Sequence, residues 1–311
     1  SAPDIDSVYD VPINFEKDKL GDLLIKSLKL KERKGPGLFA WTKFVNSVKN
    51  YEKEINIAIV GKYFNTGDFV LTDAYVSVLE AIKYSSYSQK VKPKIHTINA
   101  FDFETKNPDY TILETFDGVI VPGGFGEKGI EGKLNVIKYA RENKIPCFGL
   151  CYGMQLMVIE YARNVLKLNN ANTAEIDSKA PYIIIDIMPD QKNKLLNKDY
   201  GGSMRLGLYK SKVNKGTIAY KAYKSEMIEE RHRHRYEVNY DYVEKLVNTG
   251  LVFSSTSPDG KLMEIAELPT SVHPFFLGTQ FHPEFLARPL NPHPLFTEFI
   301  IASKKKSENN I

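Results

Sequence analysis

The segment IPCFGLCYGMQLMVIEYARN, residues 145–164, joins an apolar run to a stretch of helical length. Residues 145–150 are typical of a buried strand, and residues 152–164 are typical of a helix that follows directly. Gly149 and Gly153 flank Cys151 and leave room for a sharp turn. The segment therefore predicts a strand–turn–helix elbow that carries a cysteine at its tip.

The same alternation of strand and helix extends on both sides of this elbow. Strand-like runs at 55–63, 92–100 and 116–124 alternate with helical patterns at 72–84 and 131–144. The later part is richer in strands, expected at 180–188, 204–213, 250–268 (a hairpin) and 274–281, before a closing helix from about Pro294. This order predicts an α/β fold: a parallel-centred sheet covered by helices on both faces, with a β-rich second half.

The first 50 residues differ from this regular pattern. They are polar with scattered apolar anchors, and a short amphipathic helix is expected over 20–30. Trp41, Phe44, Val45 and Val48 then recur at helical spacing. We interpret residues 1–50 as a linker joined to an upstream domain, residues 51–303 as the main domain and residues 304–311 as a polar tail.

Composition narrows the class of protein. The chain has 311 residues, 42% of them hydrophobic, which is enough for a sizeable core. The net charge of +4 is small for this length and gives no case for nucleic-acid binding. No apolar run is long enough to cross a membrane. The two cysteines, four residues apart, make no disulfide framework, so we expect a reducing, cytoplasmic setting.

Cys151 has the position of a nucleophile. A thiol reacts as the thiolate, and the positive end of a helix dipole favours that charge. The backbone N–H of Tyr152 would point to the place where an oxyanion develops. The alternative is a small buried side chain, and this is the interpretation that we apply to Cys147.

His282 is the candidate base. It follows an apolar strand in GTQFHPEF, residues 278–285, and Glu284 lies two residues further on. A histidine at a strand's carboxyl end reaches the sheet edge where Cys151 is expected, and a carboxylate can fix its tautomer. The alternative is a surface histidine beside a turn.

A glycine pair follows the third predicted strand. In VPGGFGEKG, residues 121–129, Gly123 and Gly124 allow backbone N–H groups to approach a ligand closely. Taken alone, this segment would be an ordinary turn. It lacks the lysine and hydroxyl residue of a phosphate-binding loop.

With these three pieces together, residues 51–303 resemble the class I glutamine amidotransferases. The resemblance implies the flavodoxin-like fold of that family and a triad made of Cys151, His282 and Glu284. It also implies an oxyanion hole formed by Gly123, Gly124 and the Tyr152 N–H.

More specific segments resemble the CTP synthases, one branch of that family. These are EERHRHRYEVN (229–239), VPGGFG (121–126), GGSMRLG (201–207), NANTAEI (170–176) and SVYDVP (7–12). By charge pattern alone, residues 231–235 fit either a phosphate patch or a solvated strand, and we favour the strand. The resemblance instead implies glutamine-binding residues: Gly124, Tyr152, Gly153, Met154, Gln155, Glu175 and Arg235.

The resemblance also implies a function for the chain and a larger parent enzyme. The chain would hydrolyse L-glutamine, and its ammonia would pass to an N-terminal synthetase domain that converts UTP to CTP. We expect no cofactor or metal in this domain, whereas ATP, Mg and allosteric GTP are implied for a full-length homotetramer. The family usually has leucine directly after the nucleophile, whereas this chain has Tyr152. We expect this larger side chain to change the shape of the pocket.

Other interpretations stay open at this point. The glutaminase of another amidotransferase, such as a GMP synthase or a carbamoyl-phosphate synthetase, would share the triad. A γ-glutamyl peptidase would use similar residues on peptides. A non-catalytic regulatory or assembly module could keep the same fold. A metal enzyme is disfavoured, because no cluster of His, Cys and carboxylates has the spacing of metal ligands.

Overall fold

The computed structural model describes residues 4–5, 7–32, 35, 37–61, 75–188 and 204–309. Parts of the expected elements at 55–63 and 72–84, and part of the motif at 201–207, lie outside these residues. The main body is a nine-stranded sheet in the order β2-β1-β3-β4-β12-β11-β10-β7-β8. All of the expected strands are present among the described residues, including the strand favoured for the basic segment, which is β8.

The sheet has a parallel half and an antiparallel half. The parallel half consists of β1 (Glu54–Gly61), β2 (Lys92–Asn99), β3 (Gly118–Val121), β4 (Cys147–Leu150) and β12 (Phe276–Thr279). The antiparallel half consists of β11 (Met263–Glu267), β10 (Val252–Thr256), β7 (Arg205–Val213) and β8 (Met227–His234). The carboxyl ends of β3, β4 and β12 therefore meet at one edge, where the predicted catalytic residues follow them.

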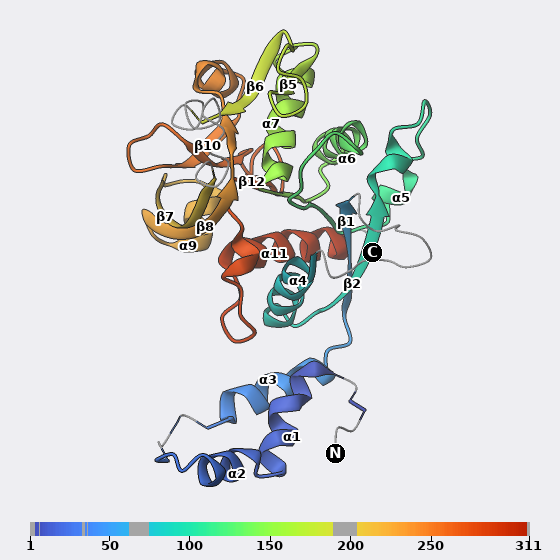
Figure 1. Ribbon diagram of the computed structural model, residues 1–311. Coiled ribbons are helices and arrows are strands. Elements are labelled where there is room, and N and C mark those ends of the chain that lie inside the picture. Colours follow the sequence, from blue (N-terminus) through green and yellow to red (C-terminus); the bar gives the residue numbers. More distant parts are fainter. Residues whose placement is uncertain are drawn as a thin grey trace.

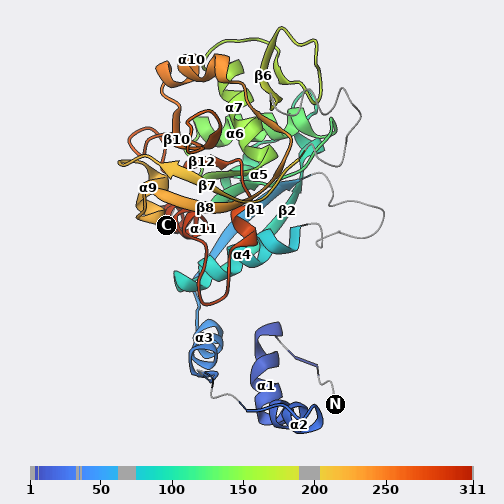
Figure 2. The same cartoon turned by 60° about the vertical axis from the view of Figure 1, so that its left-hand side comes forward.

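Helices cover both faces of the parallel half (Figure 2). On one face lie α4 (Val76–Ser88) and α11 (Pro294–Asn309), and on the other lie α6 (Ile130–Glu142) and α7 (Tyr152–Asn164). The side chains of these strands contribute to two separate hydrophobic cores, one on each face of the sheet. In β1, Ile57 and Ile59 pack with the α4 and α11 side, whereas Ala58 and Val60 pack with the α6 and α7 side. The predicted fold class is confirmed.

A small second sheet lies beside the large one, at the edge where the parallel strands have their carboxyl ends. It contains β5 (Ala171–Thr173), β6 (Tyr182–Ile187) and β9 (Tyr236–Val238). The chain passes directly from β8 to β9, so Arg235 lies at the junction of the two sheets. The remaining short elements are α5 (Thr111–Glu114), α9 (Ile218–Tyr223), α10 (Val243–Asn248), η1 (Val8–Asp10), η3 (Ala100–Phe103), η5 (Tyr240–Tyr242) and η6 (Pro283–Phe285).

The N-terminal segment forms three helices, α1 (Val11–Lys17), α2 (Leu20–Ser27) and α3 (Phe39–Lys49), at one end of the molecule (Figure 1). Tyr9 connects them to α4. Its hydroxyl donates a 2.6 Å hydrogen bond to Glu80, and its ring lies 6.1 Å from Tyr87 and 5.6 Å from Phe44. The boundary at residue 50 stays a prediction.

The C-terminal segment differs in part from the sequence prediction. The helix expected from Pro294 is present, but it continues to Asn309, so residues 304–309 of the predicted polar tail are helical. Lys304 and Lys306 donate to backbone carbonyls of Gln89 and Phe116, which holds this last part against the sheet. Within the described ranges, no helix is long and apolar enough to span a membrane.

Two helical glycines provide a test of this packing. A Cβ at position 132 in α6 would lie 1.8 Å from the Ala100 backbone oxygen, whereas nothing lies within 4 Å of a Cβ at position 21 in α2. We expect Gly132→Ala to lower the free energy of unfolding by about 1–3 kcal/mol. We expect Gly21→Ala to raise it by about 0.5–1 kcal/mol. Urea unfolding measures both, and equal effects would contradict this account of the contact between α6 and the Ala100 turn.

Candidate active site

Cys151 lies in a strained elbow between β4 and α7. Its backbone has φ 51° and ψ −102°, a conformation that a residue with a side chain rarely adopts. A Cβ on Gly153 would lie 2.1 Å from the Val121 carbonyl oxygen, and one on Gly149 would lie 2.7 Å from the Gly153 carbonyl carbon. Only glycines allow β3, β4 and α7 to approach this closely, and their approach fixes the turn that presents the thiol.

His282 and Glu284 lie together after β12. His282 Nδ1 is 2.7 Å from Glu284 Oε1, and both side chains are buried. Because a carboxylate only accepts, Nδ1–H is the donor and Nε2 is left to face other groups. The ring stacks on Phe285, with 4.8 Å between centroids, and the His282 N–H donates to the Arg231 carbonyl at 2.8 Å. The imidazole is therefore fixed in position and in tautomer.

The glycine loop after β3 completes this arrangement. A Cβ on Gly123 would lie 3.2 Å from His282 Cε1 and 3.7 Å from Cys151 Cβ, so the loop, the thiol and the imidazole meet at one point. Further along the loop, the Gly126 N–H donates to Glu175 Oε1 at 3.0 Å. Glu175 therefore holds the loop in place from the second half of the chain.

The charge state of His282 follows from these contacts. Burial alone would lower the pKa of the imidazole, but the Cys151 sulfur and the Glu284 carboxylate raise that pKa from 6.5 to about 10. The ring is therefore protonated at neutral pH. A protonated imidazole beside a sulfur atom is the state that can give a proton to a leaving group.

A cavity of about 760 Å³ opens beside Cys151. Nine of the residues predicted from the sequence line it: Gly123, Gly124, Cys151, Tyr152, Gln155, Glu175, Arg235, His282 and Glu284. The opposite charges of Glu175 and Arg235 thus line the same cavity as the thiol. Arg235 Nε is buried and has no hydrogen-bond partner among the described groups.

Two predicted residues do not reach this cavity. Gly153 faces the Val121 carbonyl of β3, and Met154 packs against Gly278 of β12. The helical period explains this difference, because residues 152 and 155 lie on one face of α7 and residues 153 and 154 point toward the sheet. Gly153 and Met154 are thus not among the residues that line this cavity, and their role in glutamine binding stays a prediction.

Gln280 was not identified as a site residue from the sequence. Its side chain is fully buried, and its Nε2 lies 3.8 Å from Cys151 Sγ. Gln155 fixes the orientation of this amide: its Nε2 donates to the Tyr236 carbonyl at 2.9 Å and to Gln280 Oε1 at 3.2 Å. An amide N–H group therefore faces the sulfur. The available signal was a polar residue directly after the buried strand β12.

The basic segment at 231–235 is a strand with two different faces. Burial alternates strictly along β8, so Arg231 and Arg233 are exposed while His232 and His234 are buried. The predicted strand is present, but it is solvated on one face only. The histidines point into the protein because β7, β9 and β11 supply polar partners there.

A family comparison accounts for this geometry. The family described as glutamine amidotransferase class-I matches residues 70–302. The chain belongs to the class I glutamine amidotransferases.

Solved and curated relatives of this class I glutamine amidotransferase share more than the family. It is 48% identical over 307 residues to the CTP synthase of Caldanaerobacter subterraneus subsp. tengcongensis, covering 99% of this chain and 55% of that protein. The CTP synthase of Pyrococcus furiosus is 48% identical over 313 residues, covering 100% and 56%. The chain thus spans about half the length of these relatives.

The Trypanosoma brucei CTPS glutaminase domain with bound acivicin has a TM-score of 0.74 and 37% identity, covering 81% of this chain and 94% of that one. The predicted resemblance to CTP synthases is therefore confirmed. Among the described residues, no group of three or more His, Cys, Asp or Glu side chains could hold a metal ion.

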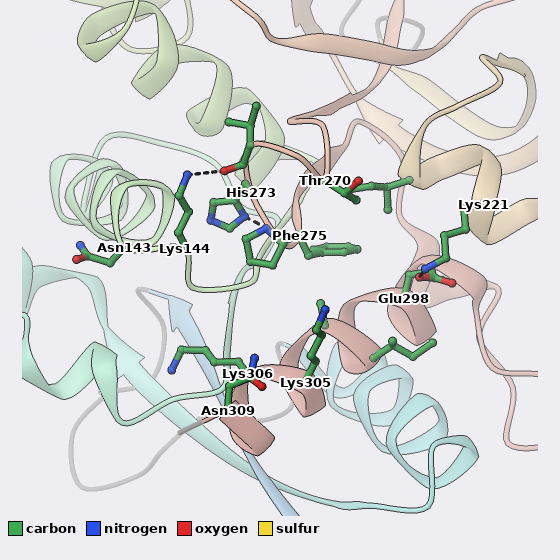
Figure 3. Close-up of a pocket in the computed structure, with 15 residues that line it drawn as sticks. Asn143, Lys144, Lys221, Thr270, His273, Phe275, Glu298, Lys305, Lys306 and Asn309 are labelled. Atoms are coloured by element: carbon green, nitrogen blue, oxygen red, sulfur yellow. Dashed lines mark hydrogen bonds and ion pairs between the residues drawn. The ribbon is translucent and has the colours of Figure 1, made fainter. Parts of the chain in front are cut away.

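A second cavity, of about 610 Å³, lies at the opposite ends of β4 and β12 in this amidotransferase (Figure 3). Lys144 donates to the Val272 carbonyl, and Lys221 pairs with Glu298 at 2.8 Å. Of these two lysines, only Lys221 has a carboxylate partner in the cavity wall. The triad residues line the first cavity and not this one, so the chemistry belongs to the cavity at Cys151.

The protonation of His282 can be measured by ¹⁵N NMR of the histidine rings. We expect the His282 ring to stay charged at neutral pH and to titrate near pH 10, because Cys151 and Glu284 favour the charged form. In Cys151→Ala the midpoint should fall by about one unit or more. His282→Asn identifies the signal. A midpoint near the ordinary histidine value in the unaltered protein would contradict the assignment.

Proposed function

We propose that this chain is the glutaminase part of a CTP synthase. It hydrolyses L-glutamine to glutamate and ammonia, and the ammonia serves a synthetase domain that converts UTP to CTP with ATP and Mg. Allosteric GTP, a homotetrameric assembly and a cytoplasmic location belong to the same proposal. The observation that carries it is the meeting of Cys151, the His282–Glu284 pair and the Gly123 loop at one cavity. The likeness to a glutaminase domain that holds acivicin, a glutamine analogue, supports it.

The first half of the reaction forms a thioester. The Cys151 thiolate attacks the side-chain amide carbon of glutamine, and the carbonyl electrons move to oxygen. Backbone N–H groups of Tyr152 and of the Gly123–Gly124 loop stabilise that oxyanion. As the tetrahedral intermediate collapses, the C–N bond breaks and protonated His282 gives its proton to the departing ammonia.

The second half restores the enzyme. Neutral His282 takes a proton from water, which attacks the thioester carbon. The C–S bond then breaks, glutamate leaves, and Cys151 returns as thiolate beside a protonated imidazole. Glu284 keeps Nδ1–H occupied throughout, so the proton always moves at Nε2.

Substrate selection follows from charge. Glutamine carries an α-ammonium and an α-carboxylate, and the cavity offers Glu175 and Arg235, which have the complementary charges. Tyr152 replaces the smaller leucine usual in the family. Its ring is buried in the cavity wall, with the Lys133 ammonium 5.9 Å from the ring centroid.

A covalent probe tests the nucleophile. We expect acivicin to add one adduct to the unaltered chain and to Cys147→Ala, and none to Cys151→Ala, as read by intact mass. Cys147 is the matched control because it is fully buried and burial raises the pKa of its thiol. Absence of an adduct on the unaltered chain would favour the non-catalytic module, and labelling of Cys147 would contradict the assignment of the elbow.

Steady-state kinetics test the recognition residues. We expect Glu175→Gln and Arg235→Gln each to raise KM for glutamine by about 10- to 100-fold, because each removes a charged hydrogen-bond partner. The amide oxygen introduced by Glu175→Gln can still accept from the Gly126 N–H, so the loop is retained. Matched controls are Glu127→Gln and Arg231→Gln, which alter exposed charges outside the cavity lining. Unchanged KM in both test variants would refute this recognition scheme.

A further inference from the structure

Five buried polar side chains form a closed ring between the antiparallel half of the large sheet and strand β9 of the small sheet. They come from four strands, and each is at most 8% exposed: Arg205 of β7, His232 and His234 of β8, Glu237 of β9 and Glu264 of β11. None of them belongs to the triad. Burying five ionisable groups is costly unless they are paired with one another, so their contacts need an explanation.

The contacts close into a ring. The two imidazoles meet at 2.9 Å, from His232 Nδ1 to His234 Nε2. At one end, His234 Nδ1 lies 3.3 Å from Glu237 Oε1, and at the other, His232 Nε2 lies 3.7 Å from Glu264 Oε2. Arg205 Nη1 closes the ring, at 2.8 Å from Glu264 Oε1 and 3.5 Å from Glu237 Oε1.

Counting protons constrains this ring. Burial and the Arg205 charge lower the pKa of His232 to about 2 and that of His234 to about 3, so both rings are neutral and carry one N–H each. One of these N–H groups lies between the two imidazoles, and the ring nitrogens that face the glutamates make no hydrogen bond of their own with the described groups. Arg205 is the one guanidinium in the ring and two buried carboxylates face it, so ionising both glutamates would leave one buried negative charge without a partner. One of the two glutamates is therefore a neutral acid.

The position of Arg205 decides which glutamate is neutral. The guanidinium is closer to Glu264 than to Glu237, so the negative charge belongs on Glu264. Burial and the nearby Glu264 raise the pKa of Glu237 well above its ordinary value. A proton on Glu237 would face His234 Nδ1 across 3.3 Å, and this arrangement favours Nε2–H on both imidazoles. The backbone of Tyr236 is a further polar neighbour of His234.

The ring has two connections to the triad. The first connection is the backbone of β8, which contacts both catalytic residues. The Arg231 carbonyl accepts from the His282 N–H at 2.8 Å, and the Arg233 carbonyl lies 3.9 Å from Cys151 Sγ. The inward imidazoles thus set the depth of the strand that touches both catalytic residues. Glu237 also interacts electrostatically with Cys151, so a charge on this glutamate would oppose a thiolate.

We propose that Arg205, His232, His234, Glu237 and Glu264 act as positioning residues that hold β8 against the catalytic pair and keep Glu237 uncharged beside the nucleophile. The importance of that nucleophile rests on the proposed function. The structure of the ring does not, so the two ideas can fail separately.

Histidine ¹⁵N NMR tests the ring without any substrate. We expect His232 and His234 both to be Nε2–H tautomers in the unaltered chain and in Glu237→Gln, whose amide imitates the protonated acid. In Glu264→Gln the amide donates to His232, so both rings should change to Nδ1–H. Glu230→Gln is the matched control: this buried β8 carboxylate pairs with His293 outside the ring, and its loss should leave both tautomers unchanged. If His232 and His234 are Nδ1–H tautomers in the unaltered chain, the proposal is overturned. This measurement does not depend on whether any variant folds.

Alkylation of Cys151 by iodoacetamide gives the functional measurement. We expect Glu264→Gln to slow alkylation at neutral pH about tenfold, because it moves the negative charge to Glu237, and Glu237→Gln to leave the rate within about twofold. A ring that only stabilised the fold would make the two variants alike, and equal rates would overturn the proposal. Because iodoacetamide needs no glutamine site, a chain that fails to hydrolyse glutamine still reports on the ring.

Discussion

The close approach of α7 to β3 and β4 is the constraint on which the site depends. Gly153 lies against the Val121 carbonyl and Gly149 against Gly153, so the chain can turn only with Cys151 at φ 51°. This strain is maintained by the packing of both faces of the sheet. Because the helix then begins directly at Tyr152, its amino end faces the cavity. The loop after β3 and the residues after β12 arrive at the same edge, as parallel strands require.

Sequence alone predicted the parts of the site that depend on local pattern. A strand, a cysteine between glycines and a helix can be recognised within twenty residues, and His282 and Glu284 lie two residues apart after an apolar run. Parallel topology brings such strand ends together, so the elbow and the histidine could be paired before their distance was known. Cys147 was correctly interpreted as a buried side chain, because it lies within the strand.

The remainder depends on tertiary pairing that local pattern does not contain. Gln280 contacts Cys151 only because β12 lies beside β4. The buried face of β8 was missed because its partners, residues 205 and 264, come from strands that are distant in sequence, and charge pattern alone indicated solvent. The roles of Gly153 and Met154 were transferred from a family pattern, which does not record the face of the helix on which a residue lies.

The contact between Tyr9 and α4 has a mechanical consequence. Tyr84 and Tyr87 lie near the end of this helix and meet the N-terminal helices, whereas Tyr75, Val76 and nearby residues at its start line the catalytic cavity. Thirteen residues of helix measure about 20 Å and bend little over that length. The helix α4 is therefore one stiff element that packs against the N-terminal segment at its far end and reaches the wall of the catalytic cavity at its start.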